Sequence, residues 1–258
     1  MPQLQRLAVT AAQICDRKID LTREQQHYLN RVLRLQAGDR FIAMDGRGHW
    51  WLAVLEAQET GLIASITEEI AVNRELPVEV TLMAALPKGN GFDEVVRQAT
   101  ELGVASIVPV TSDRTLLKPS DQKVDRWRRI AAEAAEQSER QIVPTILEPV
   151  SFELAVKDCG QKYRFICVAR GDNRHLSDCL IGSFAPPFVG AVPPCPPPAG
   201  GELSIVIAVG PEGGWTEGEV KRAIEFGFEA VSLGSRILRA VTAPIVALSL
   251  VGAAFEKC

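Results

Sequence analysis

The 258-residue sequence has six cysteines and three histidines but no CxxC pair and no cluster that combines the two residue types. Zinc sites in proteins are built from such pairs and clusters, so we expect no metal site. The cysteines are scattered along the chain, and in a protein of this length that is typical of reduced thiols in an intracellular compartment.

The sequence also lacks the patterns of a secreted or membrane protein. Its first ten residues, MPQLQRLAVT, have no charged segment followed by an apolar run, and the apolar C-terminal stretch PIVALSLVGAAFEKC is too short to span a bilayer. The net charge is −4, so the whole molecule has no basic field, although a local basic patch can still bind nucleic acid. We therefore expect a cytoplasmic protein without a membrane partner.

Two phosphate-binding signatures, GxxxxGK[ST] and GxGxxG, are absent. In their place GPEGG at 210–214 directly follows an apolar run at 204–209, and Thr216 and Glu219 after it have the spacing of a capping box. Glycines permit positive φ and close backbone approach, and α/β sheets bind ligands at the carboxyl ends of strands. We interpret this turn as one wall of a pocket whose ligand is not a pyrophosphate; a plain strand–helix connection is the alternative.

A second glycine-marked turn follows about twenty residues later, in VSLGSRILRAVTAPIVAL at 231–248. Its loop carries Arg236 and Arg239, Thr242 is positioned to cap the last helix, and Pro244 falls in the first turn of that helix. Two such loops at the ends of strands can form two walls of one pocket, which would suit a flat aromatic base.

Hydrophobic patterning divides the chain near residue 74. Short strands at 41–45, 49–57 and 62–70, with one helix starting after Thr22, predict a small β-barrel. Beyond it, strands alternate with helices, which predicts an α/β domain with a mostly parallel sheet. The expected strands are 78–86, 106–110, 163–169, 204–209 and 230–233, and the expected helices are about 92–102, 122–140, 151–158, 217–227 and 243–256. The proline-rich stretch 185–201 is expected to be an exposed insertion.

Several motifs together carry a resemblance to a known family. VGPEGGWTEGEV followed by LGSRILRAVTA resembles the SPOUT class of RNA methyltransferases, and more narrowly the ribosomal RNA small subunit methyltransferase E family. HYLNRVLRLQAGDRFIAMDGRG near the N-terminus, LPKG, ATELGV, TSDR and RWRRIAAEAAEQSERQIVP extend the resemblance over nearly the whole chain. Each piece is weak alone, but their order and spacing are specific.

The resemblance implies a SPOUT-type, mostly parallel sheet with a C-terminal trefoil knot over residues 75–258, and a PUA-like RNA-binding β-barrel over 1–74. It implies S-adenosylmethionine as cofactor, a homodimer, and methylation of N3 of a specific uridine in the 16S rRNA of the small ribosomal subunit.

Site residues follow from the motifs and from the chemistry of uracil N3, which must lose a proton before it can accept a methyl group. The residues expected to stabilise the resulting anion are Arg239, Arg114 and Arg140. Glu212 is either a general base or a brace for its turn, and we favour the brace. The expected cofactor contacts are Val209, Gly210, Gly214, Leu233, Gly234, Ile237, Leu238 and Thr242, and the expected RNA contacts are Arg6, Arg31, Arg34, Lys88, Arg126 and Arg128.

One position departs from the family pattern. Members commonly read RILRTETA, whereas here Val241 replaces the acidic residue. Val241 therefore leaves one alternative open, an rRNA-binding assembly factor with impaired catalysis on the same fold. A further alternative is a different α/β enzyme that binds another nucleotide at the glycine turn.

Overall fold

The computed structural model describes the chain except residues 1–3, 59–60, 72–73, 116–118, 185–202 and 257–258. The chain forms two compact units, Met1–Glu75 with Ala135–Val143, and Leu76–Ala134 with Pro144–Cys258. The proline-rich insertion expected at 185–201 lies outside the described residues. Within the described part, no helix combines the length and apolar character needed to cross a bilayer.

The smaller unit is built on a six-stranded sheet with the order β1-β4-β5-β6-β3-β2. Its strands are β1 (Arg6–Ala8), β2 (Ile14–Cys15), β3 (Lys18–Ile19), β4 (Arg40–Met44), β5 (Trp50–Gln58) and β6 (Gly61–Ile70). The pair β1–β4 is parallel and the other pairs are antiparallel. The three strands predicted from the sequence correspond to β4, β5 and β6, while β1, β2 and β3 are too short to give a clear alternating pattern.

One helical segment packs on this sheet. Thr22 caps α1 (Arg23–His27) in the predicted capping box with Gln25. The segment continues as a π-helical turn, η2 (Tyr28–Val32), and ends with Arg34 at φ +57°. Leu29 anchors the segment in the core, where it is fully buried with Phe41 and Leu55.

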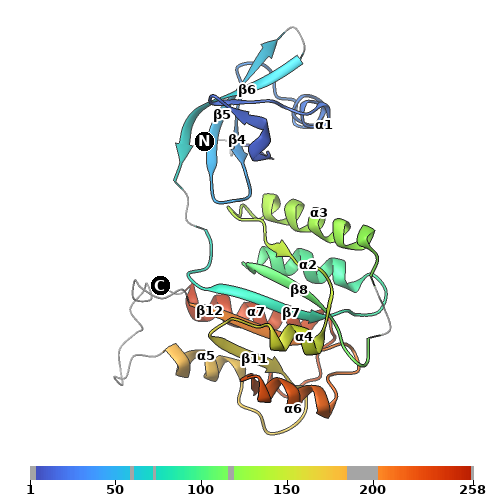
Figure 1. The fold of residues 1–258 in the computed structure, drawn as a ribbon. Coiled ribbons are helices and arrows are strands. Elements are labelled where there is room, and N and C mark those ends of the chain that lie inside the picture. The colour runs from blue at the N-terminus through green and yellow to red at the C-terminus, as the bar shows by residue number, and fades with distance from the viewer. Residues whose placement is uncertain (1–3, 59–60, 72–73, 116–118, 185–202, 257–258) are drawn as a thin grey trace. The chain divides into compact units, whose positions relative to one another are not determined.

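The larger unit is organised around a seven-stranded sheet in which each described pair of neighbours is parallel. The strand order is β10-β8-β7-β12-β11-β13, with β9 beside β8. Figure 1 labels the four central strands of this order, β8, β7, β12 and β11. The strands are β7 (Glu79–Ala85), β8 (Ser106–Thr111), β9 (Thr145–Ile146), β10 (Val150–Ser151), β11 (Tyr163–Cys167), β12 (Ser204–Val209) and β13 (Glu229–Val231). Five of the six residues of the central strand β12 are buried, as expected for a sheet covered on both faces.

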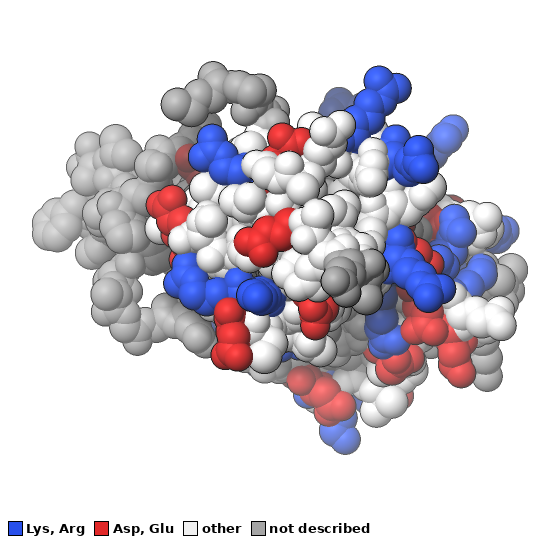
Figure 2. Space-filling view, turned by 90° about the horizontal axis from the view of Figure 1, so that it is seen from above, with Lys and Arg blue, Asp and Glu red and all other residues white. Residues whose placement is uncertain are grey.

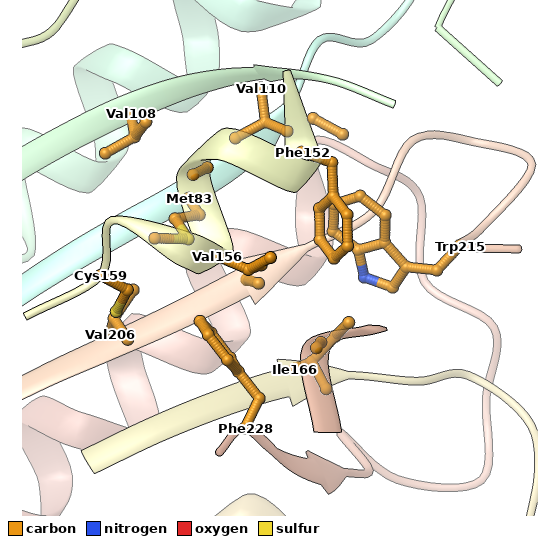
Figure 3. Close-up of a cluster of buried hydrophobic side chains, with 14 residues drawn as sticks. Met83, Val108, Val110, Phe152, Val156, Cys159, Ile166, Val206, Trp215 and Phe228 are labelled. Carbon is orange, nitrogen blue, oxygen red and sulfur yellow. The ribbon is translucent and has the colours of Figure 1, made fainter. Parts of the chain in front are cut away.

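Helices cover both faces of this sheet. Helices α4 (Phe152–Lys157) and α6 (Glu217–Glu225) contact each other and share a core with alternate residues of the strands, such as Met83, Val206 and Ile166 (Figure 3). On the other side α7 (Thr242–Phe255) contacts β12, α2 (Gly91–Glu101) and α5 (Leu176–Phe184). The sequence analysis did not predict α5, β9 or β10.

Helix α3 (Asp121–Gln137) ends three residues earlier than predicted. Glu139 has φ +60°, and the Arg140 N–H donates to the Ala135 carbonyl, as in a Schellman C-cap. This turn places Arg140 beyond the helix, so the predicted end of the helix at residue 140 is wrong. The sequence does not indicate this helix end, because the residue with positive φ in such a cap is usually glycine and here it is Glu139.

Candidate functional site

A pocket of about 310 Å³ opens at the carboxyl ends of β11, β12 and β13. The two glycine-marked turns both line it, together with the segment that follows β11. Nine of the predicted site residues are brought together here: Val209, Gly210, Glu212, Gly214, Leu233, Gly234, Ile237, Leu238 and Arg114. The sheet order explains the convergence, because β11 lies between β12 and β13 and all three strands run in the same direction.

The first turn, 210–214, needs its glycines for two different reasons. Gly214 has φ +68°, and its N–H donates to the Pro211 carbonyl over 2.8 Å. A Cβ on Gly210 would lie 3.2 Å from the backbone nitrogen of Trp215 and 3.3 Å from its indole ring. Glycine is therefore required at Gly214 by backbone conformation and at Gly210 by close packing.

Trp215 anchors the end of this turn in the core. Its indole packs against Phe152 of α4 with ring centroids 4.5 Å apart, within the cluster shown in Figure 3. Immediately after it, Thr216 and Glu219 form the predicted capping box of α6. The buried Glu219 carboxylate also accepts the Asp113 N–H at 3.0 Å, so the turn is held both to α6 and to the loop after β8.

Two side chains connect the first turn to neighbouring loops. The Glu212 carboxylate accepts the backbone N–H of Lys88 at 3.0 Å, and Arg114 Nη1 donates to the Gly213 carbonyl. A Cβ on Gly213 would lie 3.1 Å from Arg114 Cδ, so the arginine crosses the turn closely. The Glu212 contact has the geometry of a brace.

The second turn, 232–241, is shaped by Gly234, which has φ +108° and bonds through its N–H to Ser232 Oγ at 3.1 Å. Ile237 is 68% exposed although it is apolar, and it lines the pocket. Such an exposed apolar side chain in a pocket wall is suited to cover a flat ring.

Thr242 does not cap the last helix as predicted. Helix α7 begins at Thr242 itself, its N-cap is Val241, and no side-chain cap bond forms. The Arg239 carbonyl instead accepts the N–H groups of Thr242 and Ala243, each at 2.9 Å. Neither Thr242 nor the exposed Arg239 is among the residues that line the pocket.

Val241 lies against the first turn of α2. Its Cγ1 atom is 2.9 Å from where a Cβ on Gly91 would stand, and that Cβ would also be 3.3 Å from Pro87. The side chain at this position therefore packs on Gly91 at the start of α2.

Arg140, predicted to stabilise an anion, does not line the pocket and belongs to the smaller unit. Its Nη2 atom lies 2.5 Å from Glu75 Oε2, and its side chain is only 5% exposed. The Glu75 carboxylate also accepts the N–H groups of Gln141 and Ile142. In the structure, Arg140 thus forms a buried ion pair with Glu75.

The residues predicted to contact RNA have different surroundings. In the smaller unit Arg6 pairs with Glu139 at 2.8 Å, whereas Arg31 and Arg34 are exposed. In the larger unit Lys88 is exposed, Arg126 pairs with Asp93 at 2.9 Å, and Arg128 pairs with Glu148 and Asp125. The hydrogen bond to Glu148 raises the pKa of Arg128. On the face shown in Figure 2, basic and acidic side chains are interspersed.

The sequence analysis missed the third wall of the pocket, which consists of Cys167 at the end of β11 and of Val168, Ala169 and Arg170 directly after it. Strand β11 was predicted, but its position between β12 and β13 cannot be read from one sequence. Burial raises the pKa of the Cys167 thiol to about 12, which disfavours the thiolate form.

Comparison with known proteins finds two matching domain families and several relatives. The sequence profile of an RNA methyltransferase domain matches residues 74–252, and that of an RNA methyltransferase PUA domain matches residues 21–67. The ribosomal RNA small subunit methyltransferase E of Synechocystis is 46% identical over 98% of this chain and 78% of its own length. The protein of the same name from Bacillus subtilis is 33% identical over 90% of this chain and 88% of its own.

A solved structure extends the similarity to the fold. The ribosomal RNA small subunit methyltransferase E of Neisseria gonorrhoeae, crystallised with S-adenosylmethionine, superimposes with a TM-score of 0.81 at 29% identity, covering 99% of this chain and all of that one. With its sequence profiles, relatives and fold in agreement, this chain belongs to the ribosomal RNA small subunit methyltransferase E family.

Proposed function

We propose that this protein transfers the methyl group of S-adenosylmethionine to N3 of a specific uridine in the 16S rRNA of the small ribosomal subunit. The observation that carries the proposal is the single pocket lined by both glycine turns, at the carboxyl ends of three adjacent parallel strands. The family membership, and the S-adenosylmethionine bound by the Neisseria relative, support the same reaction.

The residues of the pocket fit such a cofactor. A nucleoside needs apolar walls for its base and backbone groups for the base edge, and the pocket offers Ile237 and Leu238 with the glycine-turn backbones. We assign cofactor binding to Val209, Gly210, Gly214, Leu233, Gly234, Ile237 and Leu238, all of which line the pocket. Thr242 stays a prediction and does not line the pocket. When bound, S-adenosylmethionine supplies an activated methyl group on a sulfonium.

The protein then has two tasks at the uridine. It must align N3 with the methyl group, and it must stabilise the anion that forms when the N3 proton leaves. Arg114 lines the pocket, so we assign it to the developing charge on the uracil oxygens. Arg239 remains a second candidate for this role from the adjoining loop.

Glu212 is assigned as a positioning residue. Its carboxylate accepts the Lys88 N–H, which ties the first turn to the loop after β7. A general base would need that carboxylate free to reach the N3 proton. We therefore favour transfer of this proton to water or to another group.

The proposal also covers the oligomeric state of the protein and the roles of its two domains. We propose a homodimer, because helix α7 has only Thr242 and Ser249 as polar residues among its fourteen, and Ile245, Val246 and Leu250 are only partly buried in one chain. We also propose that residues 1–74 bind RNA, that residues 75–258 carry the catalytic site, and that the pocket turns belong to a trefoil knot.

The test is nucleoside mass analysis after the protein is incubated with labelled S-adenosylmethionine and small subunits that lack the modification. Labelled N3-methyluridine at one position is the expected result. A label on another nucleoside would overturn the N3 assignment.

Absence of label, combined with measured binding of S-adenosylmethionine and of the subunit, would favour an assembly factor in which Val241 has replaced a needed carboxylate. Binding of a different nucleotide in place of S-adenosylmethionine would overturn the cofactor assignment.

A further inference from the structure

Two arginines of the pocket have no role in the reaction as described above. Arg170 follows β11 and Arg236 lies in the second turn, and both line the same 310 Å³ pocket although they are 66 positions apart in the chain. Both residues are exposed, so their guanidinium groups are accessible to a ligand.

The other charged residues that line the pocket do not neutralise Arg170 and Arg236. The charged residues that line it are Arg114, Arg170, Arg236 and Glu212. Glu212 accepts the Lys88 N–H, and Arg114 donates to the Gly213 carbonyl. Among the described residues, no carboxylate pairs with Arg170 or Arg236. The pocket therefore holds two cationic groups whose hydrogen-bond donors remain available.

The chemical groups of the expected ligands indicate what the N–H donors of Arg170 and Arg236 can bind. A sulfonium is positively charged and is repelled by arginine, so the two residues are unsuited to the methyl-donating end of the cofactor. A guanidinium prefers carboxylate or phosphate oxygens, which it can bind through two parallel N–H bonds. S-adenosylmethionine carries such a carboxylate, and the target nucleotide carries phosphates.

We propose that Arg170 and Arg236 form an oxyanion-binding subsite of this pocket. The subsite holds either the carboxylate of the cofactor or a phosphate beside the target uridine. The inference rests on the proposed function, because it takes the two ligands from that reaction.

The experiment compares Arg170→Gln, Arg236→Gln and the double variant with the wild type. Calorimetry gives the affinity for S-adenosylmethionine and for 5′-methylthioadenosine, which keeps the adenosine and the sulfur but has no carboxylate. Filter binding to the small-subunit rRNA over a range of salt gives the RNA affinity and its salt slope. Arg222→Gln is the control, because Arg222 is exposed on α6, pairs with Glu153 and does not line the pocket.

Two results support the subsite and identify its ligand. A roughly tenfold loss of affinity for S-adenosylmethionine, with unchanged affinity for 5′-methylthioadenosine, assigns the carboxylate. Unchanged affinity for both small molecules, with weaker RNA binding and a salt slope reduced by about 0.7 per arginine removed, assigns the phosphate.

The subsite is overturned if all affinities of the double variant stay within about twofold of those of Arg222→Gln. It is also overturned if S-adenosylmethionine and 5′-methylthioadenosine weaken equally, because the arginines would then act on the shape of the pocket. A wild-type protein that fails to bind S-adenosylmethionine contradicts the proposed function alone, and the RNA titrations still decide the subsite.

Discussion

At the residue scale, two glycines with positive φ can be compared, one in the pocket and one outside it. The comparison separates the effect of backbone strain from the effect on ligand binding. Gly214 (φ +68°) lines the pocket, whereas Gly227 (φ +82°) follows α6 and does not, and a Cβ on either would have no heavy atom within 4 Å. Alanine at either position therefore causes backbone strain without a steric clash.

We predict that Gly214→Ala and Gly227→Ala each lower the free energy of unfolding by about 1 kcal/mol. Only Gly214→Ala should also weaken S-adenosylmethionine binding, since Gly214 lines the pocket that we assign to the cofactor and Gly227 does not. Urea unfolding and calorimetry measure the two quantities. Equal cofactor affinity in the two variants would remove the first turn from the binding site.

A single substitution at Glu212 distinguishes a brace from a general base. Glu212→Gln keeps a carbonyl oxygen that can accept the Lys88 N–H but removes the charge and the basicity. We predict that single-turnover methylation by this variant stays within about threefold of wild type, because a brace needs only the acceptor, whereas loss of a general base would slow the reaction by about 100-fold or more. Glu212→Ala, which removes the acceptor, should be slower than Glu212→Gln.

At the scale of the element, η2 has an unusual backbone geometry. This π-helical turn carries the exposed Tyr28 and Arg31 and is followed by Arg34 in the left-handed region. π-Helical turns and positive φ at residues other than glycine are uncommon and are found often at functional sites. The segment is therefore the part of the smaller unit on which we test RNA binding.

We predict that Arg34→Gly weakens rRNA binding severalfold while the free energy of unfolding changes by less than about 0.5 kcal/mol. Glycine relieves the strain at φ +57°, and this offsets the entropy that it adds to the unfolded chain. Arg97→Ala on α2, where Arg97 pairs with Glu94, is the charge-matched control. Equal RNA affinities of the two variants would exclude Arg34 from the interface.

At the scale of the whole molecule, the smaller unit is completed by a segment distant in sequence. Residues Ala135–Val143 join Met1–Glu75. The contacts between them include the buried Glu75–Arg140 pair, the ion pairs of Glu139 with Arg6 and Arg74, and the hydrogen bond from Gln141 to the Gly48 carbonyl. The N-terminal unit is thus not a continuous stretch of chain.

We predict that Glu75→Ala destabilises the full-length protein by about 3 kcal/mol, because it removes the carboxylate that pairs with a buried guanidinium. Glu75→Gln should be less harmful, since its carbonyl oxygen can still accept the N–H groups of Gln141 and Ile142. Urea unfolding monitored by tryptophan fluorescence, to which the buried Trp50 of this unit contributes, measures the difference. Equal stabilities of Glu75→Ala and wild type would contradict the assigned role of this pair.

Local signals in the sequence were sufficient for much of this structure. Alternating and continuous apolar runs predicted β4 to β8 and β11 to β13, because burial on one or both faces of a sheet imposes these patterns. The capping boxes at Thr22 and Thr216 were also readable, since each depends on residues only three positions apart. The two glycine turns identified two of the three pocket walls for the same reason.

The tertiary structure decided what depends on distant residues. The order β12-β11-β13 brought Arg170 into the pocket, and pairing with Glu75 placed Arg140 in the smaller unit. Val241 was noticed as a departure, but only folding showed that it packs on Gly91. The sequence alone indicated the longer strands, most of the helices, the two glycine turns and the family, because local backbone preferences and burial patterns follow the order of residues along the chain. Strand order and long-range ion pairs decided which of these segments lie next to one another, because such contacts join positions that share no local sequence pattern.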